Sequence, residues 1–448
     1  MTDSTKTFQV AKTEADVVIF EGNYPTWPWV TRDDNGKLYY VFREDGLKDR
    51  KDTGHGYSPL GHVRITTSDD SGKTWSPSRV VADNPGKDDL GVSLAVMSDQ
   101  SFLVSYWSRF SAGGYSQAWV TRSTDGGQTW QESIPISDQD TRSRGEPVEM
   151  SNGQILVPIY RSMYHKDGLQ SIAAVSGDGG RTWQNHLVPN ASTGESNEGS
   201  ALEVEPGRII GLLRDECPAT RGLLWKTESH DFGRTWMMPI ATNVRDSTST
   251  ASPPQLGFHG DRVVLTYSDA RQVSVSMVTT DDPEFVQWNV DERVPCFQYR
   301  ADGKKIADAS YPCSVAVGPQ RRLIVDYEIE SLITPSPDHV IDYELTVERK
   351  QITGHFVDTP VDWGTASSSS PCPTTSGTSR SPALQQTLMR SRSPCEDWAL
   401  QSMTSRSRAN ECVTQCSTTA NGHFAYFASL RRIGLAFNFR RVTRRFSR

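Results

Sequence analysis

One eight-residue motif recurs along this chain at nearly constant spacing. The pattern Ser-x-Asp-x-Gly-x-x-Trp occurs four times, and successive copies start 55, 53 and 53 residues apart. Its defining positions are Ser68, Asp70, Gly72 and Trp75, then Ser123, Asp125, Gly127 and Trp130, then Ser176, Asp178, Gly180 and Trp183, and finally Ser229, Asp231, Gly233 and Trp236. A degenerate fifth copy, with Thr280, Asp282 and Trp288, starts 51 residues later. This period indicates a fold built from similar repeated units.

The residue types of the motif predict a structural turn. Serine and aspartate side chains can accept hydrogen bonds from the backbone amides of a tight turn. Glycine adopts the positive φ that such a turn requires, and tryptophan can pack back against a sheet. We therefore interpret the motif as the connection between two strands, and neither as a catalytic site nor as a calcium site.

A second repeated element lies out of phase with the first. It is a strand, a turn and a strongly apolar second strand. The apolar strands align at Leu38, Phe102, Ile155, Ile209, Val263 and Leu323. Continuous apolar runs of this kind are typical of strands covered on both faces. With about four strands per unit, the six units predict an all-β fold, a six-bladed β-propeller. The segment 341–352 would complete the last blade, and VVIF at 17–20 would close the ring.

Charge divides the chain into two unlike parts. Residues 364–448 hold twelve Arg, no Lys and three acidic residues, a balance of +9. Since the whole chain carries -7, residues 1–363 carry -16. The last part is rich in Ser, Thr and Arg and lacks apolar periodicity, which predicts disorder. The predicted organisation is an N-terminal arm at 1–16, a propeller at 17–355 and a low-complexity basic extension at 356–448.

Composition also argues against several functions. The net negative charge argues against a generic nucleic-acid binder. There is no apolar run long enough to span a membrane, and the first residues lack the pattern of a secretory signal, which predicts a cytoplasmic protein. No Cys-x-x-Cys pair occurs, so we expect no metal site and no cofactor. The oligomeric state is left open.

The topology of a propeller assigns residues to its two faces. The motif turns lie on one face, and the other face receives the starts of the first strands and the ends of the second strands. The candidates at the starts of first strands are Glu146, Glu198, Pro253 and Tyr311. Those at the ends of second strands are Arg43, Asp45, Arg161, Arg214, Asp215, Asp269, Arg271 and Glu328. So many charged groups beside buried strands favour a polar-ligand site over salt bridges between blades.

These features resemble the sialidase (neuraminidase) superfamily, whose repeats are called Asp boxes or BNR repeats. Asn197-Glu198 precedes an apolar strand that ends in Arg214, as in that family, and Tyr311-Pro312-Cys313-Ser314 is similar to the start of its last blade. The resemblance implies that Tyr311 is the nucleophile and Glu198 its base.

The resemblance also implies a set of substrate-binding residues. In the family, arginine side chains hold the carboxylate of the substrate, and Arg214, Arg271 and Arg43 match family arginines. Arg161 and Glu146, at equivalent strand ends, are predicted to contact substrate as well.

Two stretches depart from the family pattern. The family's first clamping arginine has no counterpart in Tyr24-Pro25-Thr26-Trp27-Pro28. The loop after the first blade's second strand, where the family places its acid/base aspartate, offers several groups. They are Asp45, Asp49, Asp52 and His55. Of these, Asp45 and His55 are the candidates for the proton donor.

The predicted function is a sialidase-like glycoside hydrolase that removes terminal acidic sugars from glycoconjugates, with an acidic-sugar glycan as its partner. Two alternatives are left open at this point. One is a propeller with different carbohydrate chemistry, either another exo-glycosidase or a lyase acting on uronates. The other is a propeller that binds a glycan or a protein without catalysis, because fold does not settle function.

Overall fold

The computed structural model describes most of the first 365 residues of the chain. The described ranges are 13–46, 58–110, 115–138, 140–162, 165, 167–190, 196–215, 220, 222–247, 251–299, 305–335 and 343–365. They are built from strands and two short 3-10 helices, η1 (Val290–Glu292) and η2 (Val361–Trp363), with no α-helix among them. No helix in these ranges could span a membrane. The chain divides between residues 377 and 378, and every described residue precedes this division.

The strands form six sheets, each described here from its inner to its outer strand. Blade 1 consists of β2 (Thr26–Arg32), β3 (Leu38–Asp45), β4 (Gly61–Ser68) and β5 (Arg79–Ala82), and blade 2 of β6 (Asp88–Val96), β7 (Phe102–Arg109), β8 (Ser116–Ser123) and β9 (Ile134–Pro135). Blade 3 consists of β10 (Thr141–Ser143) with β11 (Val148–Glu149), then β12 (Ile155–Arg161), β13 (Gln170–Ser176) and β14 (Gln184–Leu187). Blade 4 consists of β15 (Ser196–Glu205), β16 (Arg208–Asp215), β17 (Leu223–Ser229) and β18 (Ile240–Arg245). Blade 5 consists of β19 (Gln255–His259), β20 (Arg262–Ala270), β21 (Ser274–Thr279) and β22 (Val294–Gln298). Blade 6 consists of β23 (Lys305–Ala309) with β24 (Cys313–Gly318), then β25 (Arg321–Pro335), β26 (Tyr343–Asp358) and β1 (Val17–Glu21).

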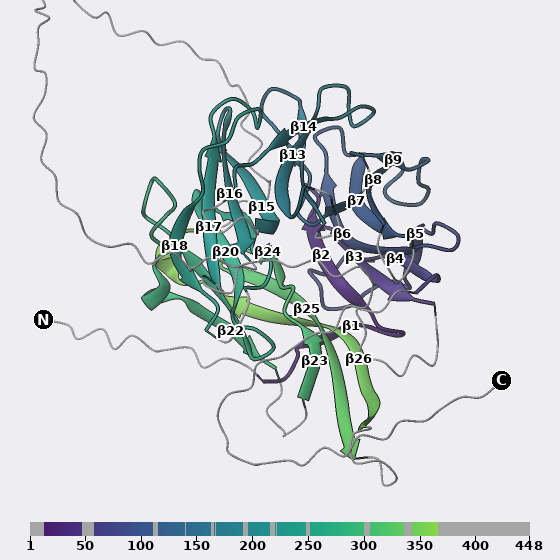
Figure 1. Ribbon diagram of the computed structural model, residues 1–448. Helices are drawn as coiled ribbons and strands as arrows, with labels where there is room; N and C mark the ends of the chain where they lie inside the picture. The colour runs from purple at the N-terminus through teal and green to yellow at the C-terminus, as the bar shows by residue number, and fades with distance from the viewer. Residues whose placement is uncertain are drawn as a thin grey trace, which may run out of the picture. The chain divides into compact units, whose positions relative to one another are not determined.

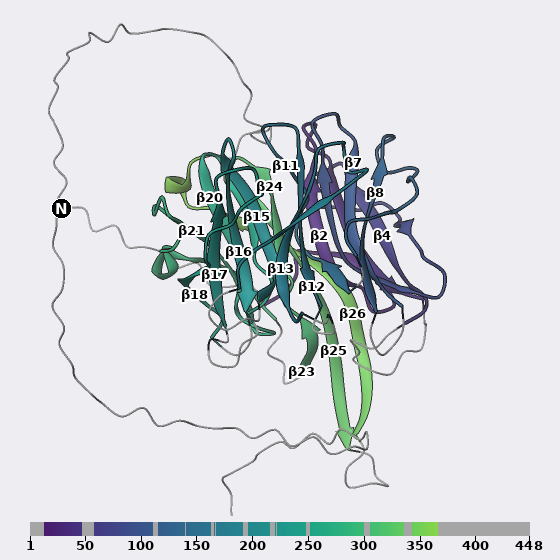
Figure 2. The same cartoon turned by 45° about the horizontal axis from the view of Figure 1, so that its top comes forward.

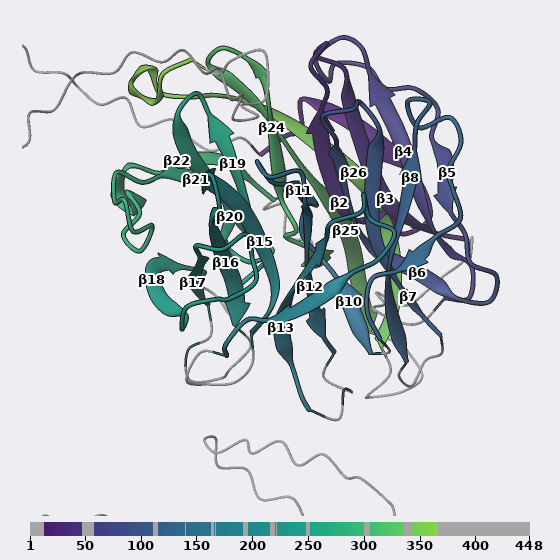
Figure 3. The same cartoon turned by 90° about the horizontal axis from the view of Figure 1, so that it is seen from above.

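These six sheets are arranged around a common centre (Figure 3), which confirms the predicted six-bladed propeller. The ring is closed by β1, which pairs antiparallel with β26 from Val17 opposite Gly354 to Glu21 opposite Gln351. The last blade therefore contains strands from both ends of the described chain. Its β25–β26 hairpin extends beyond the other blades (Figures 1 and 2).

The second strand of each blade is buried on both faces. In each of β3, β7 and β16, all residues but one are buried, as the continuous apolar runs predict. Aromatic rings join neighbouring blades, since the ring of Tyr39 on β3 meets the ring of Phe102 on β7 edge-on, with centroids 4.5 Å apart. The core thus lies between the sheets, and the ends of the strands are free to carry polar groups.

The Ser-x-Asp motifs form turns between the third and fourth strands. In blade 3, Ser176 Oγ donates to Asp178 Oδ1 at 2.8 Å and accepts from the amide of Gly180 at 2.8 Å. Thr182 Oγ1 donates to Asp178 Oδ2 at 2.6 Å, and Trp183 Nε1 donates to the Gly180 carbonyl at 3.1 Å. Gly180 has a φ of 89°, which explains the glycine of the motif.

The degenerate fifth copy keeps part of this geometry without the glycine, because Thr280 Oγ1 donates to the carbonyl of Gln287 and not to Asp282. Trp288 Nε1 donates to the carbonyl of Phe285 at 3.2 Å, and the amide of Asp282 donates to Thr280 Oγ1 at 3.0 Å. Phe285 takes the glycine position with a φ of 56°. The tryptophan bond and the turn are therefore kept where the sequence pattern is nearly lost.

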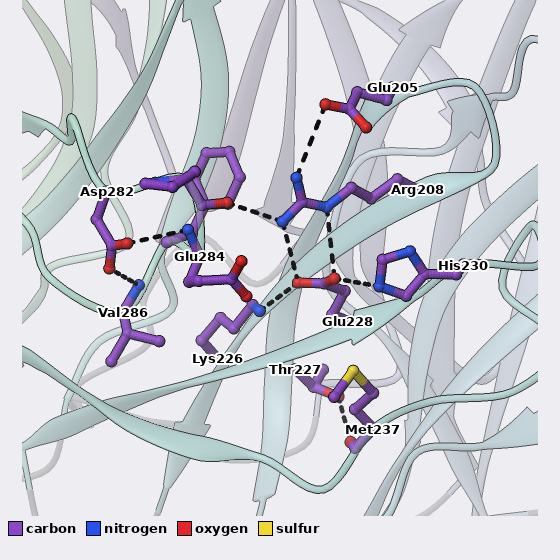
Figure 4. Close-up of polar contacts among 12 residues, drawn as sticks. Glu205, Arg208, Lys226, Thr227, Glu228, His230, Met237, Asp282, Glu284 and Val286 are labelled. Carbon is purple, nitrogen blue, oxygen red and sulfur yellow. Dashed lines mark hydrogen bonds and ion pairs between the residues drawn. The ribbon is translucent and has the colours of Figure 1, made fainter. Parts of the chain in front are cut away.

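An ion-pair network surrounds the buried carboxylate of Glu228 at the motif end of blade 4 (Figure 4). The carboxylate of Glu228 pairs with Lys226 and His230, and its Oε1 lies 3.4 Å from Arg208 Nε. Arg208 also donates to the carbonyl of Pro283 in the fifth motif at 2.8 Å. The network therefore connects blade 4 to blade 5.

The end of the propeller lies slightly beyond the predicted boundary at residue 355. Strand β26 continues to Asp358, and the side chain of Trp363 in η2 is buried in the core of blades 5 and 6. The predicted disorder of the basic extension concerns residues outside the described ranges and stays a prediction.

Candidate active site

A pocket of about 270 Å³ opens where first strands begin and second strands end, on the face opposite the motif turns. All six blades contribute residues to its wall. The lining residues are Trp27, Asp88, Leu90, Gly91, Trp107, Arg109, Arg142, Tyr160, Leu169, Asn197, Glu198, Arg214, Arg271 and Tyr311. The pocket is therefore polar, rich in arginine and walled by aromatic rings.

Tyr311 and Glu198 meet in this pocket. The hydroxyl of Tyr311 donates to Glu198, with Oη 3.1 Å from Oε2 and 3.4 Å from Oε1. Tyr311 lies between β23 and β24, two residues before β24 begins, and Glu198 lies at an irregularity in the pairing of β15 with β16, between Ser196 and Gly199. The residue before Tyr311, Ser310, has a φ of 77°, an unfavourable conformation for a non-glycine residue that is common at functional sites.

Two arginines predicted from the sequence lie beside this pair. Arg214 Nη1 forms an ion pair with Glu198 Oε2 and lies 3.5 Å from Tyr311 Oη. Arg271 follows β20, and the next amide, that of Gln272, donates to Ser310 Oγ at 2.6 Å. That bond fixes the segment that carries Arg271 against the segment that carries Tyr311.

The pKa of Tyr311 is raised from 10.0 to about 12. Burial is the main cause, and the negative charge of Glu198 adds to it, while the positive charges of Arg214 and Arg271 act in the opposite direction. Tyr311 is therefore a neutral phenol at physiological pH, with a carboxylate in position to accept its proton.

A third arginine, Arg144, lies under the ring of Tyr311. Its guanidinium carbon is 5.0 Å from the ring centroid, within the range of a cation–π contact. Arg144 is buried and donates to the carbonyls of Pro28 in blade 1 and Val92 in blade 2, at 3.2 and 3.3 Å. It therefore joins three blades beneath the nucleophile candidate and does not line the pocket.

The predicted blade 1 residues are placed differently. Arg43 is only 1% exposed, and its guanidinium bonds Asp88 Oδ1 through Nε at 2.9 Å and Asp45 Oδ2 through Nη2 at 3.3 Å. Asp45 is also buried and accepts from Ser58 Oγ at 2.5 Å. Of these three charged groups, only Asp88 lines the pocket. Arg43 and Asp45 thus support the wall from behind.

Three further predicted residues lie away from the pocket or outside the described ranges. Arg161, at the end of β12, donates to Gln170 Oε1 at 3.1 Å and is not part of the lining. Glu146 lies inside the ring beside Thr31, and burial raises its pKa to about 8. His55 lies outside the described ranges, as do Asp49 and Asp52.

Several lining residues were missed by the sequence analysis. Arg109 is the last residue of β7, as Arg161 is of β12, so the pattern of charged residues at the ends of second strands contained its signal. Arg142 was missed because the first strand of blade 3 begins at Thr141, earlier than expected. Gly145, with a φ of 140°, interrupts that strand. The consequence is that Arg142, not Glu146, reaches the mouth.

The profile of the BNR repeat-like domain matches residues 60–288, about half of the chain. The chain belongs to the BNR-repeat sialidase superfamily. Curated superfamily members with detectable similarity include a sialidase from Bacteroides fragilis, 25% identical over 211 residues, and one from Micromonospora viridifaciens, 27% identical over 219 residues. These matches cover 39% and 43% of this chain, and 37% and 32% of the two relatives. The chain therefore spans about a third of the length of these relatives.

Solved structures share the fold of this chain at low identity. A protein of unknown function from Dyadobacter fermentans has a TM-score of 0.62 and 21% identity, covering 78% of this chain and 99% of that one. The NanB sialidase from Streptococcus pneumoniae has a TM-score of 0.54 and 11% identity, covering 78% and 70%. At such identities the likeness supports the propeller alone, and the activity has to be argued from the site.

Metal binding has no support in the described ranges. They contain no group of three or more His, Cys, Asp or Glu side chains arranged to hold a metal ion.

Proposed function

We propose that this protein is a glycoside hydrolase that removes terminal acidic sugars, sialic acid or a relative, from glycoconjugates by a retaining mechanism. The observation that supports this most is the 3.1 Å contact between the Tyr311 hydroxyl and Glu198 in a pocket that also contains Arg214 and Arg271. A tyrosine nucleophile is the known exception among retaining glycosidases, and it belongs to sialidases.

The charge of the substrate explains why a phenol suits this position. A sialic acid carries a carboxylate on its anomeric carbon, and a carboxylate nucleophile would be repelled by it. The neutral hydroxyl of Tyr311 avoids that repulsion. Arg214 and Arg271 provide guanidinium groups that bind a carboxylate through paired, charge-assisted hydrogen bonds.

The proposed reaction has two steps. In the first, the Tyr311 oxygen forms a bond to the anomeric carbon as the bond to the leaving oxygen breaks, and Glu198 takes the phenolic proton. In the second, water attacks the anomeric carbon as the bond to Tyr311 breaks. Glu198 returns its proton to the phenolic oxygen, and the group that protonated the leaving oxygen takes a proton from the water. The leaving oxygen needs a proton in the first step. We propose that it comes from the segment 47–57, which contains Asp49, Asp52 and His55, because Asp45 is buried behind the wall.

The test compares wild type, Tyr311→Phe and Tyr115→Phe on a fluorogenic sialoside. Tyr115 is 54% exposed and does not line the pocket, so its variant is the matched control. We expect turnover by wild type and by Tyr115→Phe, and its loss in Tyr311→Phe. Undiminished turnover by Tyr311→Phe would refute the nucleophile assignment.

A second candidate function, different carbohydrate chemistry, is favoured by Trp27. This residue lines the pocket in the stretch where the family carries its first clamping arginine. The same preparation is therefore tested on uronate-ended oligosaccharides. A product with the absorbance of an unsaturated uronate would indicate a lyase, and saturable glycan binding without turnover would indicate a binding protein.

A further inference from the structure

Arg144 extends from blade 3 to the nucleophile candidate in blade 6. It directly follows β10, where Gly145, with a φ of 140°, interrupts the first strand. Its guanidinium carbon lies 5.3 Å from the ring centroid of Trp29 in blade 1 and 5.0 Å from that of Tyr311 in blade 6. In a ring of six blades, blade 6 lies opposite blade 3 (Figure 3). The guanidinium therefore lies at the common centre of the sheets.

This guanidinium is buried and is held by neutral acceptors. Arg144 is only 2% exposed, and its Nη1 donates to the carbonyls of Pro28 at 3.2 Å and Val92 at 3.3 Å. None of the ion pairs found between described residues includes Arg144. A buried charge without an opposite charge is costly. Proteins keep such unfavourable features mainly at functional sites, so the positive charge of Arg144 requires an explanation.

Two carboxyl groups lie in the same region, but neither neutralises Arg144. Burial raises the pKa of the Cys313 thiol, and the charges of Arg144, Asp326 and Glu146 also act on it, which places all of them near one another. Burial raises the pKa of Glu146 to about 8, so this carboxyl group is mostly uncharged at neutral pH. Burial also raises the pKa of Asp326 to about 7. The oxygens of Asp326 accept hydrogen bonds from the hydroxyl of Tyr299 and from the amides of Tyr311 and Tyr327.

A cation against the ring of Tyr311 has a direct effect on its ionisation. The face of a neutral phenol already attracts a cation. When the phenol loses its proton, the negative charge spreads from the oxygen into the ring, and the attraction increases. An opposite charge within about 4–6 Å typically shifts a pKa by about 1–3 units, and the guanidinium carbon of Arg144 is 5.0 Å from the ring centroid. Arg144 therefore favours the phenolate, whereas burial disfavours it.

Other charged groups reach the Tyr311 phenol from four further elements. Burial and two carboxylates raise its pKa, and two arginines lower it; these groups are Glu198 of β15, Arg214 of β16, Arg271 after β20 and Asp308 of β23. Arg214 and Arg271 line the pocket, where a bound substrate carboxylate would offset their charges. Arg144 does not line the pocket. Its charge therefore stays directed at the ring of Tyr311 when substrate is bound.

We infer that Arg144 stabilises the phenolate form of Tyr311 from the face of its ring, as the phenolic oxygen bonds to the anomeric carbon and later leaves it. This role in turnover rests on the proposed function. In the first step the proton moves to Glu198 while the new bond forms. In the second, the electron pair of that bond returns to the phenolic oxygen, and Glu198 gives the proton back. Both transition states place negative charge on the ring, so Arg144 is a positioning residue that acts through Tyr311.

The experiment measures the pKa at position 311 by fluorine NMR in the full-length chain, with fluorotyrosine incorporated in place of Tyr311. The fluorinated phenol is more acidic than tyrosine and gives a single resonance, so its titration can be followed while the protein is folded. The uncharged variants Arg144→Gln and Arg144→Met should each raise this pKa by about one unit or more. Arg144→Lys, which keeps the charge, should raise it by less than about half a unit.

The matched control is Arg322→Gln. Arg322 is also buried and donates to the carbonyl of Phe258 at 2.9 Å, but it is not among the described residues that contact the ring of Tyr311. Its variant should leave the pKa at position 311 unchanged. Melting temperatures show which variants are folded, and either uncharged variant of Arg144 is sufficient for the comparison.

Turnover of a fluorogenic sialoside is measured in the same variants with the natural Tyr311. In Arg144→Gln, kcat should fall by about tenfold, the equivalent of one pKa unit. KM should change little, because Arg144 does not line the pocket. Arg144→Lys should recover most of the lost kcat, which a role in packing alone would not explain.

The two proposals fail in different ways. If the pKa at position 311 does not rise in a folded, uncharged variant of Arg144, the inference is overturned, whether or not wild type turns over a sialoside. A raised pKa with undiminished kcat also overturns it, because the charge then has no part in the reaction. If wild type turns over no sialoside, the proposed function is refuted, and the titration still decides whether Arg144 stabilises the phenolate.

Discussion

Replacing Glu198 by glutamine tests whether its charge governs the acidity of Tyr311. The pKa of Tyr311, about 12 in place of 10.0, disfavours the phenolate by about 2.7 kcal/mol, at about 1.4 kcal/mol per pKa unit. Burial causes most of this rise, and Glu198 at 3.1 Å adds to it, whereas Arg214 and Arg271 oppose it. Glu198→Gln keeps the shape, removes the negative charge and leaves the arginines. We therefore expect the pKa of Tyr311 to fall by about one unit or more, or at least about 1.4 kcal/mol.

The assay is a spectrophotometric titration of tyrosinate. The chain contains 14 tyrosines, so the signal of Tyr311 is obtained by subtracting the curve of a Tyr311→Phe variant made in the same background. Glu132→Gln, at an exposed position, is the matched control and should leave the titration unchanged. The reasoning is wrong if the pKa of Tyr311 in Glu198→Gln is equal to or higher than in wild type.

In Glu198→Gln, turnover should fall although Tyr311 becomes more acidic. Although Tyr311 ionises more easily in Glu198→Gln, the general base is gone, and sialoside turnover should fall by about 10²–10⁴-fold. If Glu198→Gln lowers the pKa of Tyr311 and leaves turnover undiminished, Glu198 is not needed as the general base.

Three further predictions concern stability, each measured as the free energy of unfolding. Gly233→Ala should cost at least about 1 kcal/mol more than Gly126→Ala. Both glycines have positive φ, but a Cβ at Gly233 would lie 2.6 Å from a leucine side chain and one at Gly126 would meet nothing within 4 Å. Ser176→Ala should cost about 1–2 kcal/mol, because the Gly180 amide loses its acceptor in the turn. Lys226→Met should cost about 1–3 kcal/mol at neutral pH, because the buried carboxylate of Glu228 loses its lysine partner while Arg208 remains beside it.

The last prediction has a defined pH dependence. Burial alone would raise the pKa of Glu228, but hydrogen bonds from Lys226 and Arg208 outweigh it and the pKa is lowered. A carboxylate with a lowered pKa contributes stability above its unfolded-state pKa, and this contribution is lost as the pH falls through the folded-state value. The difference between wild type and Lys226→Met should therefore shrink as the solution is acidified below about pH 4. A difference between wild type and Lys226→Met that stays constant below that pH would contradict this explanation. Equal costs for Gly233→Ala and Gly126→Ala would contradict the steric explanation of the glycine, and an unchanged free energy of unfolding in Ser176→Ala would contradict the role of its hydroxyl in the turn.

The ring could be predicted from the sequence because its determinants are local and repeated. The tryptophan motifs mark one turn in each of four blades, and the apolar second strands mark all six. Once strands alternate in direction, the positions of Glu198, Arg214, Arg271 and Tyr311 at strand ends follow from topology alone, and the structure brings these four together.

The rest of the site depends on contacts between blades, which no local pattern encodes. Arg43 lies at a strand end like Arg214, but Asp88 of the next blade pairs with it and the guanidinium is buried behind the wall. The start of the first strand of blade 3 could not be predicted from the sequence either. Gly145 divides this strand, and as a result Arg142 lines the pocket in place of Glu146. Sequence periodicity therefore locates the pocket, and packing across blades decides which charges enter it.

Ring closure by β1 has a consequence for how the chain is made. The amide of Phe356 in β26 donates to Asp16 beside β1, across 340 residues of sequence. At synthesis rates of about 5–20 residues per second, the N-terminal strand waits on the order of tens of seconds before its partner leaves the ribosome. During that time β1, with the sequence VVIFE, is an apolar strand whose backbone groups have no pairing partner. Such strands tend to associate with other chains. We therefore expect closure to be the least local step of folding, and a chain interrupted before β26 to leave the pairing edge of β1 open.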